Sequence, residues 1–432
     1  MNYVSFKINV DTNSFDYCTD NNIEIFSLLK NPLKRVNFDG NKVDAEKYFV
    51  VVDGGRATGD WTYNPNGNIL LFDVLERELK NDSKFSLVYK DLLERKCSIL
   101  FYFREQTLIN TNEFYDQLNK TINLLNIDKD QLMFFIIEFY NTGLRKKNYQ
   151  ILSTPFHGFN MGWWDMDRIK KIKEFYDLYS EYSSYFLKQK HFTCTNNRIK
   201  HSRSWVTYTL FENNLLDKGY VSYLANNNDP ENQYDFDDFL LDMKHSQGKD
   251  SRYIFSDEKN RELKEFYDLL PIECDTDDNI KVDTHLSHLA IQGVVLNSYF
   301  NIITESSGDG SKNKHGRIFF TEKIWKPIVA KQPFILISDL GYLEALNQIG
   351  FKTFEPFVDE SYDKLIGVDK YKKIESEIIR LCNMTKTEIH EWYWNLNDIL
   401  DFNSDFFMKM LLNSVGEITK FINNNWNGRN RI

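Results

Sequence analysis

Residues 299–339 read YFNIITESSGDGSKNKHGRIFFTEKIWKPIVAKQPFILISD, and this stretch decides the fold that we expect for the chain. It contains an apolar strand that ends at Glu305, a polar loop at 306–316, a helix that opens at Thr321 and a second apolar strand at 333–337. A strand, a loop, a helix and a strand in this order form the unit from which nucleotide-binding α/β domains are built. We therefore expect a parallel sheet with a ligand site near the loop.

The point where the loop meets the helix carries the candidate chemistry. Thr321 can cap the helix through its hydroxyl, and Glu322 and Lys323 then fall in the first turn, where free N–H groups and the helix dipole favour anions. Pro327 lacks an N–H, so we expect the helix to be short or kinked. A phosphate group would suit this position. The alternative is an ordinary capped helix with a solvated Glu-Lys pair, because capping residues are common.

The length of 432 residues exceeds a single typical core, so two domains are the default expectation. We place an N-terminal α/β domain at 1–187, a second α/β domain at 188–380 and C-terminal helices at 381–432, which can dock back onto the first domain. Hydrophobic residues make up 42% of the chain without an apolar run of about 18 residues, which indicates a soluble protein with no membrane span. The first residues show no secretory signal, so we expect a cytoplasmic location.

Charge and cysteine content restrict the functional classes. The net charge of −10 weighs against a protein whose whole surface binds nucleic acid, although a local basic face is compatible with it. The five cysteines are scattered and form no closely spaced pair, which indicates neither a disulfide framework nor a zinc site. His285 and His288 lack a third ligand nearby, so we expect no metal site there.

The N-terminal half alternates apolar runs with helical patterns. We expect strands at 3–10, 48–52, 98–103, 132–137 and 149–152, and helices at 73–94, 111–125 and 167–187. Asp53, Glu105 and Glu138 each follow one of these strands, where ligands of open α/β sheets bind, so each is a candidate general base. The alternative is that they are ordinary loop acids.

An aromatic run at 156–165 contains Trp163 and Trp164, which can stack on a sugar or base of the acceptor or pack between domains. Asp165 and Asp167 have the spacing of a metal-binding triplet, but they follow two tryptophans at an expected helix start. We therefore do not assign a metal to them.

A basic island interrupts the acidic chain near residue 190. Between Glu181 and Glu212 there is no acidic residue, and the island consists of Lys188, Lys190, Arg198, Lys200 and Arg203. A diphosphate would suit it, because arginine can donate two hydrogen bonds to phosphate oxygens. The alternative is a boundary patch that pairs with the acidic stretch 229–242.

Two motifs carry a resemblance to a known family. The pattern KxFxxTNxxxxxxR at 190–203 and the segments YFNIITE and FFTEKIW at 299–325 resemble the fucosyltransferase-like glycosyltransferases. The stretches FTCTNNRIKHSRS and FFTEKIWKPIVAKQPFILISD also look like glycosyltransferase-type proteins of large viruses and phages. The resemblance covers about residues 188–365. As a compound motif it is fairly specific, whereas TEK alone would be weak.

The resemblance implies a GT-B fold of two Rossmann-like α/β domains with a C-terminal helical tail, in which the second domain binds a nucleoside-diphosphate sugar without a metal ion. Carried over, Glu322 would hold the ribose hydroxyls, and Lys323 and Arg203 would neutralise the diphosphate. Asn196 would support the adjacent loop, and Glu305 would face the donor sugar. Arg198 and Thr321, the threonine of the TEK triplet, are also expected to bind the nucleotide sugar.

The chain departs from the family at three places. Thr304 stands where the family has Phe, Phe319 stands where it usually has Tyr, and the loop 306–316 is longer than usual. The missing hydroxyl at Phe319 leaves the base and the sugar undetermined. The first domain shows no match, so Asp53, Glu105 and Glu138 remain alternatives for the base.

Two functional hypotheses follow. In the first, the chain transfers a sugar to a glycan, a small hydroxylated molecule or a hydroxymethylated base of viral or phage DNA, by inversion or retention, in the host cytoplasm if it is viral. In the second, it is a catalytically silent carbohydrate- or nucleotide-sugar-binding module or a virion-associated structural protein. The presence of both Lys323 and Arg203 favours the enzyme.

Overall fold

The chain forms two compact units, which are described separately. The computed structural model describes residues 2–9, 14–17, 34–35, 43, 45–56, 86–104, 112–137, 139–140, 150–154, 166–226, 233–245, 256–274, 293–305 and 318–427. The first unit consists of Met1–Gly162, His315–Phe320 and Met410–Ile432, and the second consists of Trp163–Lys314 and Thr321–Lys409. Both units are of the α/β class.

The first unit is built on one large sheet. Its strands are β1 (Asn2–Asn9), β2 (Ser14–Tyr17), β3 (Lys34–Arg35), β4 (Tyr48–Arg56), β5 (Cys97–Arg104), β6 (Leu132–Ile137) and β8 (Gln150–Thr154). Its helices are α3 (Ser86–Leu93) and α4 (Asn112–Leu125), with a 3-10 turn η3 (Lys129–Gln131). A separate antiparallel ribbon joins β7 (Phe139–Tyr140) to β12 (Ile318–Phe319).

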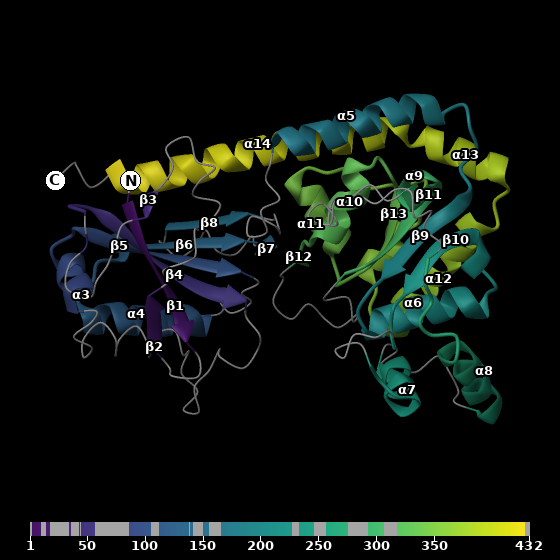
Figure 1. Cartoon of the computed structure of the whole chain (residues 1–432), viewed down its shortest axis with the longest axis horizontal. Coiled ribbons are helices and arrows are strands. Elements are labelled where there is room, and N and C mark those ends of the chain that lie inside the picture. The colour runs from purple at the N-terminus through teal and green to yellow at the C-terminus, as the bar shows by residue number, and fades with distance from the viewer. Residues whose placement is uncertain are drawn as a thin grey trace. The chain divides into compact units, whose positions relative to one another are not determined.

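The strand order of the first sheet is β2-β1-β4-β5-β6-β8, with β3 also paired to β1. All pairs except β1–β2 are parallel, and the parallel strands β1, β4, β5, β6 and β8 follow one another in chain order. Right-handed crossovers in one direction put the connecting helices on one face, and α3 and α4 lie there in Figure 1. Strand β3 is parallel to β1 and lies on the edge of β1 opposite β4, so the described strands of this sheet also reverse their order, between β1 and β4.

The central strands β4, β5 and β6 of the first sheet contain apolar runs, which is typical of strands covered on both faces. Residues 48–52 and 97–101 are buried along their whole length. The C-terminal part of α14 (Asn397–Asn427) lies along the face opposite α3 and α4 and buries Leu411, Ile418 and Ile422. This spacing puts the three apolar side chains on one stripe of the helix.

The second unit has a four-stranded parallel sheet. Its strands are β9 (Lys190–Asn196), β10 (Gly219–Tyr223), β11 (Ser298–Thr304) and β13 (Phe334–Ile337). Its helices are α5 (Met166–Ser183), α6 (His201–Glu212), α7 (Phe236–His245), α8 (Asp257–Tyr267), α9 (Gly293–Leu296), α10 (Glu322–Val329), α11 (Tyr342–Ile349), α12 (Gly367–Cys382), α13 (Lys386–Asn395) and the start of α14, with 3-10 turns η5 (Leu216–Lys218) and η9 (Glu360–Lys364).

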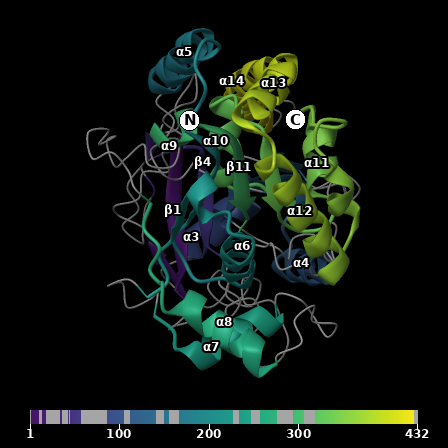
Figure 2. The ribbon, with the colours of Figure 1, turned by 90° about the vertical axis from the view of Figure 1, so that its right-hand side faces the viewer.

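The second sheet reverses its chain order, which gives it a Rossmann-like topology. The order is β10-β9-β11-β13, so the chain leaves β9 to one side for β10 and then returns to the other side for β11 and β13. Crossovers in opposite directions place α6 and α10 on opposite faces of the sheet (Figure 1). Figure 2 shows α12 beside α6, where the rings of Trp205 and Tyr371 lie 4.4 Å apart. The position at which the strand order reverses is the topological switch point. It lies between the carboxyl ends of β9 and β11.

The expected elements agree with the structure at most positions. The five N-terminal strands appear at the expected places, as do the helices at 111–125 and 167–187, and the helix expected at 73–94 is described only as α3. The helix that opens at Thr321 is short, as expected from Pro327, and buries Ile324, Trp325, Ile328 and Val329. Among the described helices, none combines the length and the apolar character needed to cross a bilayer.

One close approach in the second sheet makes a testable prediction. An added Cβ at Gly219, the first residue of β10, would lie 2.2 Å from a ring carbon of Phe192, which is itself fully buried. The ring cannot swing into solvent, so Gly219→Ala is expected to destabilise the unit by about 1–3 kcal/mol through overpacking. The midpoint of urea unfolding measures this.

Gly416→Ala is the matched control, because an added Cβ there meets nothing within 4 Å. This glycine lies inside α14, where alanine is expected to stabilise by about 0.5–1 kcal/mol. Equal midpoints for the two variants would mean that the Gly219–Phe192 contact does not limit the packing of the sheet.

Candidate functional site

The switch point of the second sheet is closed by a hydrogen bond between the two strands that form it. Thr304, the last residue of β11, donates from its hydroxyl to the side-chain oxygen of Asn196, the last residue of β9, over 2.6 Å. Both side chains are buried. The chain therefore brings together two motif residues that are 108 positions apart, at the place where open α/β sheets bind ligands.

The carboxylate of Glu305 lies next to this bond and is fully buried. Its Oε2 accepts from the hydroxyl of Thr321 over 2.6 Å, and its Oε1 accepts from the hydroxyl of Tyr342 over 2.8 Å. The backbone N–H of Glu305 donates to Ile337 of β13. A buried carboxylate needs such donors. Glu305 therefore joins β11 to the first residues of α10 and α11, and no part of its side chain is exposed to a substrate.

The N-terminus of α10 is positioned by this carboxylate. Thr321 is the N-cap residue, as expected, and its hydroxyl oxygen accepts from the backbone N–H of Lys323 over 3.3 Å. The ammonium group of Lys323 lies 3.3 Å from the same oxygen, and its side chain is half-buried. Glu322 is the first residue of the helix, and its side chain lies outside the described part. One cation thus stands in the first turn, at the positive end of the helix dipole.

A second cation stands at the start of α6, directly after the switch-point strand β9. Arg203 is buried and donates to the carbonyl oxygen of Arg198 over 2.9 Å, which holds its guanidinium over the turn between β9 and α6. Burial raises the pKa of Cys194 in β9 to about 12, although Asn196 and Arg203 act in the opposite direction. Arg203 therefore lies close to the carboxyl end of β9.

The carboxyl end of β13 is held by a buried lysine. Lys370 of α12 donates to the carbonyl oxygens of Ser338, over 2.6 Å, and Asp339, over 3.3 Å. Burial lowers the pKa of Lys370, and Asp363 and Asp339 oppose this. Asp363 in turn accepts from the backbone N–H of Glu344 in the first turn of α11. Lys370 thus holds the residues that follow β13, and Asp363 holds the first turn of α11. Tyr342, which donates to Glu305, is the first residue of that helix.

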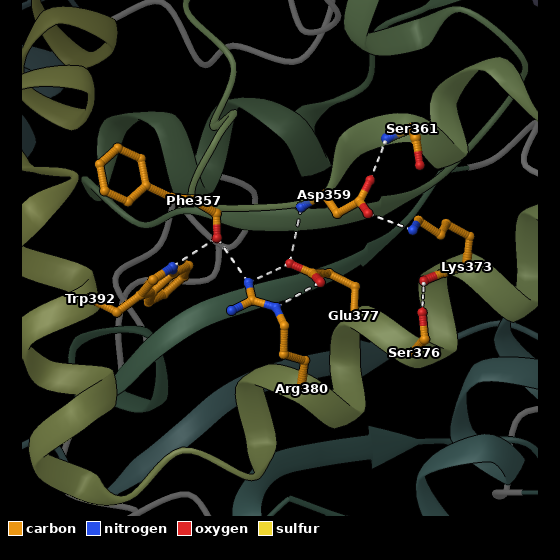
Figure 3. Close-up of polar contacts among 8 residues, drawn as sticks. All are labelled: Phe357, Asp359, Ser361, Lys373, Ser376, Glu377, Arg380 and Trp392. Atoms are coloured by element: carbon orange, nitrogen blue, oxygen red, sulfur yellow. Dashed lines mark hydrogen bonds and ion pairs between the residues drawn. The ribbon is translucent and has the colours of Figure 1, made fainter.

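A polar network on α12 and α13 holds the segment that leads to Asp363 (Figure 3). Glu377 accepts two hydrogen bonds from Arg380 and one from the backbone N–H of Asp359. Arg380 and the indole of Trp392 both donate to the carbonyl oxygen of Phe357. The network therefore holds the backbone of the segment at Phe357 and at Asp359.

Two adjacent acids of this segment, Asp359 and Glu360, have pKa values shifted in opposite directions. Donation from Lys373 lowers the pKa of the half-exposed Asp359 to about 2. Burial raises the pKa of Glu360 to about 7, although its carboxylate accepts from the backbone N–H of Phe354.

The candidate bases of the first unit belong to neighbouring parallel strands. Asp53 was expected after a strand at 48–52, but β4 continues to Arg56, so Asp53 lies inside the strand and pairs with Lys7 and Tyr102. The register shifts between Asp53 and Arg56, and a bulge of this kind accommodates the two glycines. Glu105 and Glu138 lie outside the described residues.

The remaining predicted residues are placed as follows. Trp163, Trp164, Asp165, His285, His288 and the loop 306–316 lie outside the described residues, and Asp167 lies in α5. Phe319 belongs to the short strand β12 and pairs with Phe139, and nothing is described of its side chain.

The basic island is divided by strand β9. Lys188 and Lys190 lie at the amino end of the strand, whereas Arg198, Lys200 and Arg203 follow its carboxyl end. Seven residues of strand span roughly 20 Å, so the island is two separate cationic surfaces. Only the second belongs to the switch point.

Sequence reasoning missed Tyr342 and Lys370. Both act on the site from helices that follow the last strand, and they contact Glu305 and Ser338 from 37 and 32 positions away. The family resemblance extends to about residue 365, so it covers the region of Tyr342 but not that of Lys370. It assigned a role to neither residue.

Comparison with known proteins adds no relative to this picture. No protein-family model matches the chain, and no curated protein matches it at a significant level.

Proposed function

We propose that the chain is a glycosyltransferase of the GT-B type that transfers a sugar from a nucleoside-diphosphate sugar to a hydroxyl group of an acceptor. The observation that carries the proposal is the switch point of the second sheet. There the bonded pair Asn196 and Thr304 lies beside two helix starts that bear cations, Lys323 on α10 and Arg203 on α6. A crevice at a switch point suits a nucleotide, and cations at helix N-termini suit its phosphates.

The proposed mechanism uses these cations on the leaving group. Negative charge develops on the nucleoside diphosphate as the glycosidic bond breaks, and fixed donors aimed at that charge lower the barrier. Lys323 and Arg203 take this role in place of a metal ion. Glu305 acts through Thr321 and keeps the first turn of α10 in position, because its own carboxylate is buried and occupied by two hydroxyl groups.

The first unit takes the acceptor in this proposal. The carboxyl ends of β4, β5 and β6 lie side by side, and the candidate bases Asp53, Glu105 and Glu138 belong to them or follow them. One of these carboxylates would accept the proton of the attacking hydroxyl group in an inverting reaction.

Thermal unfolding with nucleoside diphosphates tests the proposal. UDP, GDP, CDP, ADP and their common sugars are added one at a time, and one of them is expected to raise the melting temperature, because a ligand of the folded state stabilises it by mass action. The shift is expected to persist in EDTA. If no nucleotide shifts the transition, the donor site is absent. If the shift appears only with added Mn²⁺, the two cations do not replace a metal ion.

A further inference from the structure

Exposed apolar side chains are concentrated in one short part of the second unit. Tyr185, Phe186 and Leu187 follow α5 with 81%, 70% and 53% of their surface exposed, and Phe175 and Leu178 on α5 are 45% and 60% exposed. Of the eleven large apolar side chains that are exposed in the described part of the chain, these five fall within thirteen consecutive residues. Contiguous exposed apolar surface of this kind marks a binding surface.

Three lysines crowd beside the apolar turn. Lys190 donates to the carbonyl oxygen of Asp217, Lys218 to that of Cys382, and Lys386 to that of Gln189, over 2.6, 2.6 and 2.7 Å. The three lysines are neighbours, because Gln189 directly precedes Lys190 and Cys382 lies four residues before Lys386. Burial and the charges of Lys190 and Lys218 lower the pKa of Lys386.

These lysines form no ion pair with a described carboxylate. All three ammonium groups contact backbone carbonyl oxygens instead. Glu388 on the same helix as Lys386 uses its carboxylate on the backbone N–H of Thr385, as part of a capping box. The chain as a whole carries a net charge of −10, so a local positive surface does not follow from its composition.

The apolar turn and the lysines form one surface. Lys386 also donates to the carbonyl oxygen of Lys188, and a ring nitrogen of His390 lies 3.3 Å from the carbonyl oxygen of Ser184. The last turn of α5 and helix α13 therefore meet at the same end of the second unit (Figure 1). We call this surface the basal patch; it consists of Tyr185, Phe186, Leu187, Lys190, Lys218 and Lys386.

We propose that the basal patch binds the surface of a lipid bilayer that contains anionic lipids. Aromatic and aliphatic side chains enter the boundary between headgroups and acyl chains, while neighbouring lysines pair with lipid phosphates and carboxylates. The lysine stems can lie along apolar surface and keep their charged ends at the headgroups. Insertion of apolar side chains and attraction between lysines and anionic lipids are each weak alone. Stable attachment to a membrane generally needs two such interactions together.

A second copy of this chain fits the basal patch less well. A symmetric dimer through the patch would bring two groups of lysines together, and like charges in contact repel. A bilayer with anionic lipids instead meets both the charge and the apolar side chains.

The basal patch and the candidate site lie at opposite ends of the second sheet. Lys190 opens β9 and Lys218 directly precedes β10, so the patch lies at the amino ends of the parallel strands. Asn196 and Thr304 lie at their carboxyl ends. A protein held at a bilayer by its basal patch would therefore keep the switch point away from the lipid. The proposal does not depend on sugar transfer.

Co-sedimentation of the full chain with vesicles tests the proposal. The protein is expected to bind vesicles of phosphatidylcholine with phosphatidylserine, and to bind vesicles of phosphatidylcholine alone at least about tenfold more weakly. Added salt is expected to weaken the binding, because it screens exposed charges. Replacing Tyr185, Phe186 and Leu187 together by serine is expected to weaken it at least about tenfold.

Leu241→Ser combined with Leu269→Ser is the matched control. These leucines are 52% and 51% exposed in the same unit but lie on α7 and after α8, so their loss is expected to leave vesicle binding unchanged. The proposal is overturned if the unaltered protein binds neither kind of vesicle, or if the triple serine variant binds as well as the unaltered protein. Self-association that only the triple variant loses, without vesicle binding, would assign the patch to a second copy.

Discussion

Lys323→Ala is expected to reduce sugar transfer by at least about a hundredfold, the usual scale for the loss of one group that stabilises a developing negative charge. The ammonium group lies in the first turn of α10, 3.3 Å from the hydroxyl of the N-cap residue Thr321. In the proposed function its charge adds to that of the helix N-terminus, and both would act on the oxygen atoms of the diphosphate. The steady-state rate is measured with the sugar of the nucleotide that raises the melting temperature.

Whether Lys323→Ala changes kcat or KM distinguishes stabilisation of the transition state from binding of the donor in the ground state. The charge on the diphosphate grows as the bond to the sugar breaks, so the interaction with Lys323 is stronger in the transition state than in the bound donor. We therefore expect most of the loss in kcat, with a smaller rise in KM. A loss confined to KM would mean that Lys323 contributes only to ground-state binding.

Lys326→Ala is the matched control for this variant. Lys326 lies in the last turn of the same short helix, so it has the same helical context but stands away from the N-terminus. We expect its replacement to leave transfer within about a factor of two. Normal turnover in the Lys323 variant would remove the assignment of the donor site to α10.

Local patterns in the sequence predicted the elements around the site. The strands β5, β6 and β13 are apolar runs, and Thr321 is a residue type that caps helices, so both features follow from side chains that are adjacent in the chain. The basic island shows the limit of this reasoning. Its residues are neighbours in sequence, but a strand of seven residues separates them in space, and the length of β9 decides which cations belong to the site.

The contacts of Glu305 show a second limit. Its position at the end of a strand follows from the sequence, whereas its burial depends on Tyr342, which lies beyond the next strand. The extension of β4 through Gly54 and Gly55 has a similar cause. Glycines normally mark a turn, but pairing with β5 keeps them in the strand through a bulge. Tertiary contacts decide these features, and no local pattern reports them.

Glu305→Ala is expected to destabilise the second unit by about 3 kcal/mol. The change removes a buried carboxylate and leaves the hydroxyl groups of Thr321 and Tyr342 without their acceptor, in addition to a cavity. Unfolding in urea is followed by the fluorescence of Trp205 and Trp325, which are buried in this unit. Tyr342→Phe removes only one of the two donors, so its expected cost is about 1 kcal/mol.

Glu305→Gln separates a positioning role from a direct role in the reaction. Glutamine keeps the size of the side chain, and its amide can accept from one hydroxyl group and donate to the other, so we expect a loss of stability below about 1.5 kcal/mol. Because the carboxylate is buried and bonds the N-cap hydroxyl of Thr321, transfer is expected to fall by less than about tenfold, far less than in Lys323→Ala.

Stability in urea and the rate of sugar transfer together decide whether Glu305 has a positioning role. A Gln variant of normal stability whose transfer is abolished would show that the carboxylate touches the donor sugar, as the family resemblance implies. That result would require the residues that cover Glu305 to move when the donor binds, since its side chain is fully buried. A stable and active Gln variant beside an unstable Ala variant would instead identify Glu305 as the residue that holds the helix N-terminus in place for Lys323.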